Sequence, residues 1–453
     1  MKNISRRRFL RRGTETLLGA GLALGSNPLR ALAFGDDISG GAASGYRALV
    51  CIYLEGGCDG FSLMVPTGSY EQRAFAQARG NLAVGAEDII PLGGGNSPIG
   101  INRNAALLQP LYDEGRLAMI SNVGTLIQPT SVEQYLNNEV PLPAQLFSHS
   151  DQTIQWQQLQ GRGRGMDGWG AKAASYLESF QDKDYLTSIS LAGSNYWQTG
   201  ATRRPFTLTE DGVLKYAGMN PNDAWEQPRA EAFERVLEIN QSHVMTRAYA
   251  DLQKRALSVT TELGATLEQN AAMFSDTPED NPLAAKLAMV SQIIASQQTL
   301  GLRRQIFYVT MPGFDVHDNQ AKQQPELFTK LAEAISYFQG KMQELGQSDN
   351  VTAFTASDFG RSLLSNGDGT DHGWGNHLMA VGGAVNGGSI YGTLPELDPN
   401  GADSVHRGRI LPTQSATQYA ATLLDWIGLQ PDQVNDVLPN LQNFDSRNLG
   451  FLS

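Results

Sequence analysis

The stretch ALVCIYLEGGCDG, residues 48–60, carries the pattern that decides the fold. Its first seven residues, ALVCIYL, are continuously apolar, which is typical of a strand covered on both faces, as in a parallel sheet. A glycine-rich turn with Glu55 and Asp59 follows the strand directly. In an open α/β sheet the loops at the carboxyl ends of strands line the functional crevice, so the position of Asp59 indicates a site there.

Similar apolar or β-branched runs recur along the chain and predict further buried strands at residues 117–123, 186–191, 306–311, 351–356 and 378–381. Between them, apolar residues at three- and four-residue spacing predict helices at residues 282–300, 325–345 and 413–426. Strands that alternate with helices favour an α/β fold with a mostly parallel central sheet flanked by helices. Residues from about 198 to 280 are charged and helical without a clear strand, and we expect a helical insertion there.

The N-terminus has the three parts of a twin-arginine export signal in the right order. Residues 5–10 read SRRRFL, residues 14–26 are weakly apolar, and residues 31–33 read ALA, a small-residue cleavage site. We expect residues 1–33 to be removed after passage through the twin-arginine export machinery, which leaves a periplasmic or secreted protein. The alternative is a basic amphipathic helix that stays attached. The apolar part is shorter than the about 20 residues of a membrane span, so we expect no stable span after cleavage.

Removal of the signal makes the chain more acidic. The signal holds seven basic side chains and one acidic side chain. The mature chain therefore keeps 27 of the 34 basic and 45 of the 46 acidic side chains, a net charge of −18. Such a surface repels nucleic acid, so nucleic acid is excluded as a partner.

Two cysteines remain, Cys51 and Cys58. A straight strand would hold them roughly 20 Å apart, whereas a disulfide needs Cα atoms within about 7 Å. We therefore expect two small buried thiols rather than a bridge.

Polar residues cluster at the ends of four predicted strands. These residues are carboxylates and imidazoles, the ligands that divalent metals such as zinc, manganese, magnesium or calcium take. A metal held by them can polarise a phosphoryl or sulfuryl oxygen and activate a nucleophile. The proposed metal ligands are Asp59, Asp315, His317, Asp358 and His372.

Each of these positions also has a purely structural explanation. Asp59 and Asp358 can cap the next helix, and Asp315 with His317 can belong to a surface loop. His377, in the same segment as His372, fits a supporting or core position better than a ligand position.

Two further residues are candidates for catalysis. Ser148, next to His149, is the better candidate nucleophile, whereas Ser150 fits an N-cap. Arg361 can clamp an anion or pair with one of the aspartates. No G-x-S-x-G elbow surrounds the serines, and no phosphate-binding loop is correctly placed.

Four pieces of the chain resemble a large bacterial family known only as domain of unknown function 1501. The pieces are LEGGCDGFSLMVP at residues 54–66, FSHSDQ at 147–152, GFDVHDNQ at 313–320, and the long stretch at 357–392 that begins SDFGRSLLSNGDGTDHGWGNH. That family is similar in plan to the alkaline phosphatase and sulfatase superfamily. The resemblance implies that residues 34–453 form one alkaline phosphatase-like α/β domain and that the five proposed ligands occupy metal positions.

The chain also departs from the superfamily's pattern. Where the superfamily has an Asp-His dipeptide, this chain has Asp358 followed by Phe359, so that Asp371 or His377 would have to replace the missing ligand. The resemblance implies an exported, metal-dependent hydrolase that acts on a small-molecule or polymeric phosphate or sulfate ester. The departures keep an alternative open, in which the chain is a catalytically lapsed binding or assembly protein on the same fold.

Overall fold

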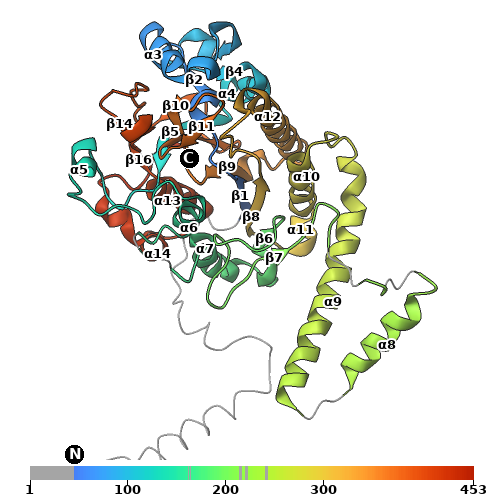
Figure 1. Cartoon of the computed structure of the whole chain (residues 1–453). Coiled ribbons are helices and arrows are strands. Elements are labelled where there is room, and N and C mark those ends of the chain that lie inside the picture. Colours follow the sequence, from blue (N-terminus) through green and yellow to red (C-terminus); the bar gives the residue numbers. More distant parts are fainter. Residues whose placement is uncertain (1–44, 162, 164, 214–216, 220–222, 240–242) are drawn as a thin grey trace, which may run out of the picture. The chain divides into compact units, whose positions relative to one another are not determined.

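The computed structural model describes residues 45–161, 163, 165–213, 217–219, 223–239 and 243–453 (Figure 1). The predicted export signal, residues 1–33, lies outside the described residues. None of the helices in the described part is both long and apolar enough to cross a membrane.

A nine-stranded sheet forms the centre of the fold, in the order β13-β5-β12-β9-β1-β8-β6-β7, with β16 also paired to β5. All its pairings are parallel except those of β12 with its two neighbours. The strands are β1 Arg47–Leu54, β5 Leu117–Gly124, β6 Ser188–Ser190, β7 Phe206–Thr207, β8 Arg304–Met311, β9 Val351–Ser357, β12 Asn376–Val381, β13 Ser389–Tyr391 and β16 Gln414–Ser415. The predicted α/β fold with a mostly parallel central sheet is therefore confirmed.

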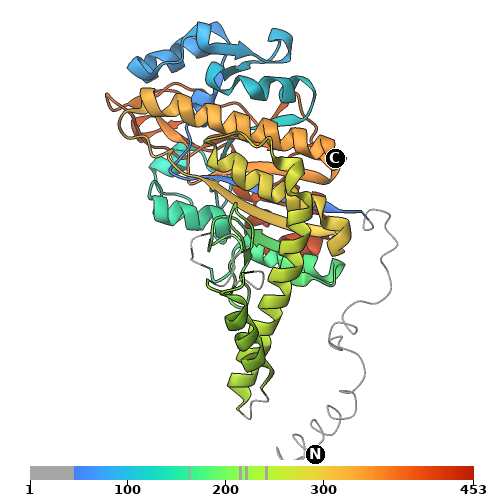
Figure 2. The ribbon, with the colours of Figure 1, turned by 90° about the vertical axis from the view of Figure 1, so that its right-hand side faces the viewer.

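The apolar strand β1 supplies both faces of the sheet, as its continuous pattern predicts. Ala48, Val50 and Ile52 belong to one buried cluster, whereas Leu49 and Cys51 belong to another on the opposite face. Helices α10 Pro282–Ala295 and α12 Gln320–Glu344 cover the first face; α7 Trp169–Leu177, α13 Ala416–Ile427 and α14 Pro431–Val437 cover the second (Figures 1 and 2). Cys51 and Cys58 are buried and free, as predicted.

The single antiparallel strand explains why the site gathers at one edge of the sheet. β1, β8 and β9 run in the same direction, so their carboxyl ends meet there. β12 runs the opposite way, and its amino end at Asn376 therefore lies at the same edge. The segment 358–375 leaves β9 and returns in β12 beside it, through the hairpin of β10 Arg361–Ser365 and β11 Thr370–His372.

Shorter elements complete the fold. They are α2 Gly60–Leu63, α3 Ser69–Arg79, α4 Gln109–Asp113, α5 Val132–Leu136, α6 His149–Gln158, the small sheet of β2 Met64–Pro66, β3 Ile89–Pro91 and β4 Ile99–Asn102, and the pair β14 Ser404–Val405 with β15 Arg409–Ile410.

The region from 198 to 280 is mainly helical, as expected, but it also contributes the edge strand β7. Its helices α8 Gln227–Glu238 and α9 Val244–Asn270 lie side by side (Figure 1). Leu263 and Leu267, in the carboxyl-terminal half of α9, join the buried cluster on the α10 side of the sheet.

Candidate metal centre

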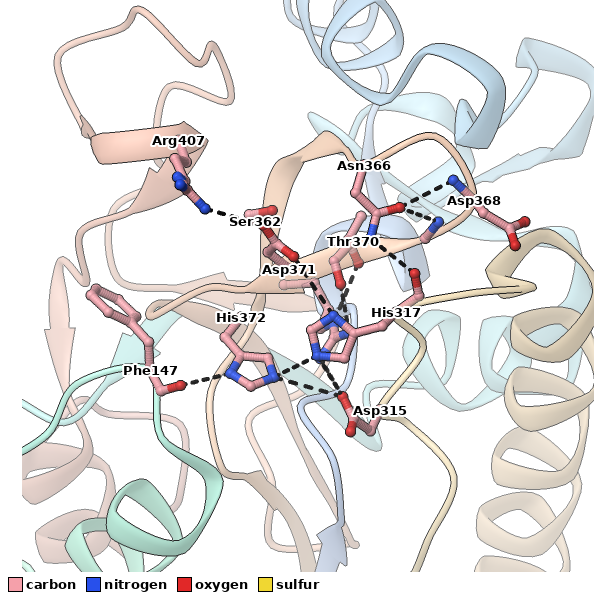
Figure 3. A network of polar contacts seen from close by, with 12 residues as sticks. Phe147, Asp315, His317, Ser362, Asn366, Asp368, Thr370, Asp371, His372 and Arg407 are labelled. Atoms are coloured by element: carbon pink, nitrogen blue, oxygen red, sulfur yellow. Dashed lines mark hydrogen bonds and ion pairs between the residues drawn. The ribbon is translucent and has the colours of Figure 1, made fainter.

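Four side chains from three separate segments form a group that can bind a metal ion. Each offers one ligand atom, and these atoms all lie within 4.8 Å of one another. The four residues are His149, Asp315, His317 and His372. Figure 3 shows three of them, with His317 and His372 facing each other above Asp315.

The carboxylate of Asp315 is the point on which the three imidazoles converge. Its Oδ1 lies 3.1 Å from Nε2 of His317, 3.3 Å from Nε2 of His149 and 3.7 Å from Nε2 of His372. Asp315 follows β8 in a turn that begins at Gly313, whose φ of +108° is accessible mainly to glycine. The turn is tied to the end of β1, because the amide of Phe314 donates to the carbonyl of Glu55.

His372 ends strand β11 and is oriented by a backbone carbonyl. Its Nδ1 lies 2.6 Å from the carbonyl oxygen of Phe147. A carbonyl only accepts, so Nδ1 carries the proton and Nε2 of the neutral ring keeps its lone pair. Phe147 has a φ of +72°, which is uncommon outside glycine, so the backbone is held in an unusual conformation where it orients this histidine.

His149, at the start of α6, is oriented by a carboxylate. Its Nδ1 lies 2.7 Å from Oδ2 of Asp358, which follows β9. The buried Nε2 of His149 makes no hydrogen bond within the described chain. The ring therefore presents an unshared lone pair to the same point as His372.

His317 completes the set. Its Nδ1 faces Oδ1 of Asp371 at 3.6 Å, and its backbone carbonyl accepts a hydrogen bond from the side chain of Asn366 (Figure 3). Metal-binding histidines usually direct their second ring nitrogen to a carboxylate or a backbone carbonyl. All three histidines of this group have such a neighbour.

His317 and His372 contact each other directly through their rings. Their Nε2 atoms lie only 2.7 Å apart. Two lone pairs at that distance repel each other unless a proton or a metal ion lies between or beside them. Three imidazole nitrogens and one carboxylate oxygen are also the donor set of a four-coordinate site for zinc or a similar transition metal.

The pKa shifts in the group follow from its contacts. The hydrogen bond to Asp358 raises the pKa of His149, although burial opposes it. Burial, together with the neighbouring His149, lowers the pKa of His372 and favours its neutral form. Burial alone would raise the pKa of Asp315, but the nearby His149 and Arg361 lower it.

Arg361 holds the carboxylate of Asp315 in place, and its hydrogen bonds to the protein leave it unsuited to bind a ligand anion. Its buried guanidinium donates to Oδ1 of Asp315 at 3.1 Å and to the carbonyls of Gly56 and Thr370. Of the two sequence-based explanations, pairing with an aspartate is the one that the structure shows.

The structure places the other predicted residues as follows. Asp59 does not join the group: it pairs with the buried Arg79 at 2.5 Å, caps α2 and accepts a hydrogen bond from Gln320. Asp358 contacts the group only through His149. Ser148 is the N-cap residue of α6, and its hydroxyl donates to Asp151 at 2.8 Å.

His377 lies in the core. It is 3% exposed and packs edge-on against Phe61, and burial lowers its pKa to about 3.

Phe359, which directly follows Asp358, forms an apolar wall of the site. Its ring stacks on His372, with ring centroids 4.6 Å apart, and lies 4.7 Å from the ring of His149. Asp371 does not take a ligand position either, because it faces the far nitrogen of His317. The donor set is therefore that of one metal ion rather than two.

Two arginines border the group. Arg407 is 73% exposed, lies 3.8 Å from Asp371 and has a φ of +63°. Arg409 donates to the carbonyl of His372 and stacks on the ring of Phe147. The same Phe147 ring lines a groove of about 220 Å³ whose other walls include Tyr135, Leu142 and His406.

His149 was not among the ligands predicted from the sequence. The stretch FSHSDQ was interpreted through its serines, as a possible nucleophile and a helix N-cap. His149 is far from His317 and His372 in the sequence. Only the fold brings the start of α6 next to them.

The chain matches the model of one protein family. A family model described as "Protein of unknown function (DUF1501)" matches residues 46–425. A search of curated protein sequences finds no match.

Several solved structures share low similarity with the chain. The sulfatase PsFucS1 from Pseudoalteromonas sp. is 13% identical, with 89% of this chain and 71% of that chain covered and a TM-score of 0.37. The phosphonate monoester hydrolase SpPMH from Silicibacter pomeroyi is 9% identical, with 89% and 76% covered and a TM-score of 0.36. The lipoteichoic acid synthase LtaP from Listeria monocytogenes is 7% identical, with 82% and 76% covered and a TM-score of 0.35.

Proposed function

The chain belongs to the DUF1501 family, whose function is unknown, so we propose a function from the chain's own residues. We propose that the protein is a metal-dependent hydrolase of phosphate or sulfate esters. The observation that carries the proposal is the convergence of three Nε2 atoms on Oδ1 of Asp315, each histidine being oriented through its other nitrogen. We propose zinc as the preferred ion, because imidazole nitrogens suit it better than they suit magnesium or calcium.

A divalent ion in this site would supply Lewis acidity to a phosphoryl or sulfuryl oxygen. The chain's own residues would hold the ion and the ester. Asp358 and the carbonyl of Phe147 fix the rings of His149 and His372, and Arg361 fixes the carboxylate of Asp315. Phe359 keeps water from one side of two of the rings.

Arg407 is the residue that we assign to the anionic ester group. Its guanidinium is largely exposed and only one side chain, Asp371, separates it from His317. An exposed arginine can offer two parallel N–H donors to a phosphate or sulfate.

Metal analysis combined with turnover assays tests the proposal. The mature protein is purified, its metal content is measured, and aryl phosphates and aryl sulfates are assayed with added Zn²⁺, Mn²⁺, Mg²⁺ or Ca²⁺. We expect about one bound ion per chain and turnover that is lost in His372→Ala and in His149→Ala. A protein that binds no metal and turns over none of these esters would exclude the proposal.

A second candidate is a metal-binding protein without catalysis, which Phe359 in the place of a histidine favours. One bound ion without turnover, and a partner recovered equally well with wild type and His372→Ala, would support this function.

We also propose export by the twin-arginine route to the periplasm or the medium, on the strength of residues 1–33. Mass spectrometry of the exported protein should find a new N-terminus near Phe34. Substitution of Arg6 and Arg7 by lysine should leave the precursor uncleaved inside the cell.

A further inference from the structure

A second pocket lies apart from the residues of the metal centre. It has a volume of about 650 Å³, within the usual range for small-molecule sites. Its walls are the turn from β2 into α3, the turn before β4, and the loop that contains residues 394–397 together with Asp403. None of the four residues of the metal group lines it.

The charge of the pocket selects against anions. Its described walls carry Glu71, Glu396 and Asp403 and no lysine or arginine. The loop that supplies two of these carboxylates is held in place by its own hydrogen bonds. Asp403 accepts from the amide of Glu396 at 2.8 Å, and Glu396 accepts from the amide of Ala402 at 3.0 Å. Phosphate and sulfate esters are therefore poor occupants of this pocket.

The rest of the pocket wall combines one exposed aromatic ring, that of Tyr70, with several hydrogen-bonding groups. Tyr70, in the first turn of α3, is 60% exposed and lies beside Pro66 and Pro98 in the lining. Asn96, Ser97 and Thr67 add amide and hydroxyl groups. An exposed aromatic ring next to neutral polar groups and carboxylates fits a ligand with apolar C–H faces and hydroxyls at its edges.

His377 adds a hydrogen-bond donor, Nε2–H, because the fold makes its other ring nitrogen an acceptor. Its Nδ1 accepts from the backbone amide of Asn122 at 3.2 Å, so in the neutral ring the proton is on Nε2. Nε2 is buried and has no hydrogen-bond partner within the described chain, and His377 belongs to the wall of the pocket. A buried donor without a hydrogen-bond partner is destabilising, and an oxygen of a ligand or of water would relieve that cost.

We propose that this pocket binds a neutral saccharide, with the sugar ring against Tyr70 and its hydroxyls bonded to the carboxylates, to Asn96 and to Nε2 of His377. The site is independent of the metal centre and of the proposed hydrolase activity.

Binding of uncharged sugars to the mature protein tests the proposal. Glucose, galactose, N-acetylglucosamine, lactose and cellobiose are screened by saturation-transfer NMR, and any binder is titrated calorimetrically. We expect at least one to bind, with affinity at least tenfold weaker in Tyr70→Ala. Tyr249→Ala is the matched control, because Tyr249 is equally exposed, at 61%, but lies on α9; it should bind like wild type.

Two further arms sharpen the result. Asn96→Ala should weaken binding without affecting the core, and inorganic sulfate should not compete with the sugar. The proposal is overturned if none of the five sugars binds, if Tyr70→Ala leaves binding unchanged, or if the pocket takes putrescine in preference to every sugar. Loss of ester turnover alone would leave these binding results unaffected, so the two proposals fail separately.

Discussion

Asp358 accepts a hydrogen bond from Nδ1 of His149, and this bond decides which ring nitrogen keeps its lone pair. With a metal ion bound, Asp358 would act on the ion through the side chain of His149. Its other oxygen, Oδ1, is buried without a hydrogen-bond partner in the described chain.

We predict that Asp358→Ala lowers zinc affinity about 10–100-fold, the usual effect of removing such a supporting group. Asp358→Asn should lower it less, because the amide oxygen can accept the same bond. Competition with a chromogenic chelator measures both affinities. Asp251→Ala, an exposed position on α9, is the control. Equal zinc affinity in wild type and Asp358→Ala would show that the ring needs no such partner.

His377 makes stability depend on pH. Its folded-state pKa of about 3 lies below the ordinary value of about 6.5, so between these values the unfolded chain binds a proton that the folded chain does not. Its contribution is therefore complete above pH 6.5 and declines by roughly 1.4 kcal/mol per pH unit as the pH falls towards 3.

We predict that His377→Gln flattens the fall in the free energy of unfolding between about pH 7 and pH 5, as measured by urea denaturation. His406→Gln, at an exposed histidine, should retain the wild-type slope. A steeper slope in His377→Gln than in wild type would contradict the assignment.

Residue chemistry alone predicted part of the site. Asp315 and His317 were predicted as ligands because they stand just after an apolar run, and His372 because it stands just before one. Asp59 stood in an equivalent place, yet the structure pairs it with Arg79, a residue that nothing nearby in the sequence connects to it. The direction of a side chain after a strand depends on the turn, which the residue types do not specify.

At the scale of elements, the turn from β1 into α2 supports the turn after β9. Gly57 has a φ of +82°, and a Cβ there would lie 2.6 Å from the ring of Phe359, which in turn stacks on His372. Gly115, between α4 and β5, has a similar φ of +73° but nothing within 4 Å of the corresponding Cβ.

We predict that Gly115→Ala costs about 1–2 kcal/mol of stability, the price of the left-handed backbone alone. Gly57→Ala should cost about 1–3 kcal/mol more, since it also displaces Phe359, and it should weaken zinc binding. Chemical denaturation and metal titration of the two variants separate these effects. Equal costs, with zinc affinity unchanged, would mean that Phe359 moves aside freely.

The strands were the most predictable elements, because buried parallel strands need continuous apolar runs. The six predicted runs all form strands of the central sheet, and the bounds differ by a few residues. The reversed direction of β12 was not predictable, since a short apolar run has the same pattern whichever way it pairs. The two-residue β7 lies in the region expected to lack strands, and its length gives no periodic signal.

For the whole molecule, the candidate metal centre joins segments that are far apart in the chain. Its four residues come from the start of α6, the loop after β8 and the end of β11. An ion that binds only when these three segments are assembled stabilises the folded state by mass action.

We predict that zinc at about 100 times its dissociation constant stabilises the mature protein by about 2.7 kcal/mol, and that a chelator reverses the gain. Thermal unfolding followed by calorimetry measures the shift. His317→Ala should abolish it while leaving the unfolding temperature without metal nearly unchanged, because His317 is 42% exposed. A zinc-induced shift that persists in this variant would place the ion elsewhere.

The excursion between β9 and β12 has a consequence for how this site can vary. Because its two ends lie on neighbouring strands, residues can be added to or removed from the turn between β10 and β11 without shifting the register of the central sheet. The β10–β11 hairpin and the central sheet can then change in sequence at different rates. Relatives can acquire other specificities through changes in this hairpin, while the strands of the sheet keep their sequence.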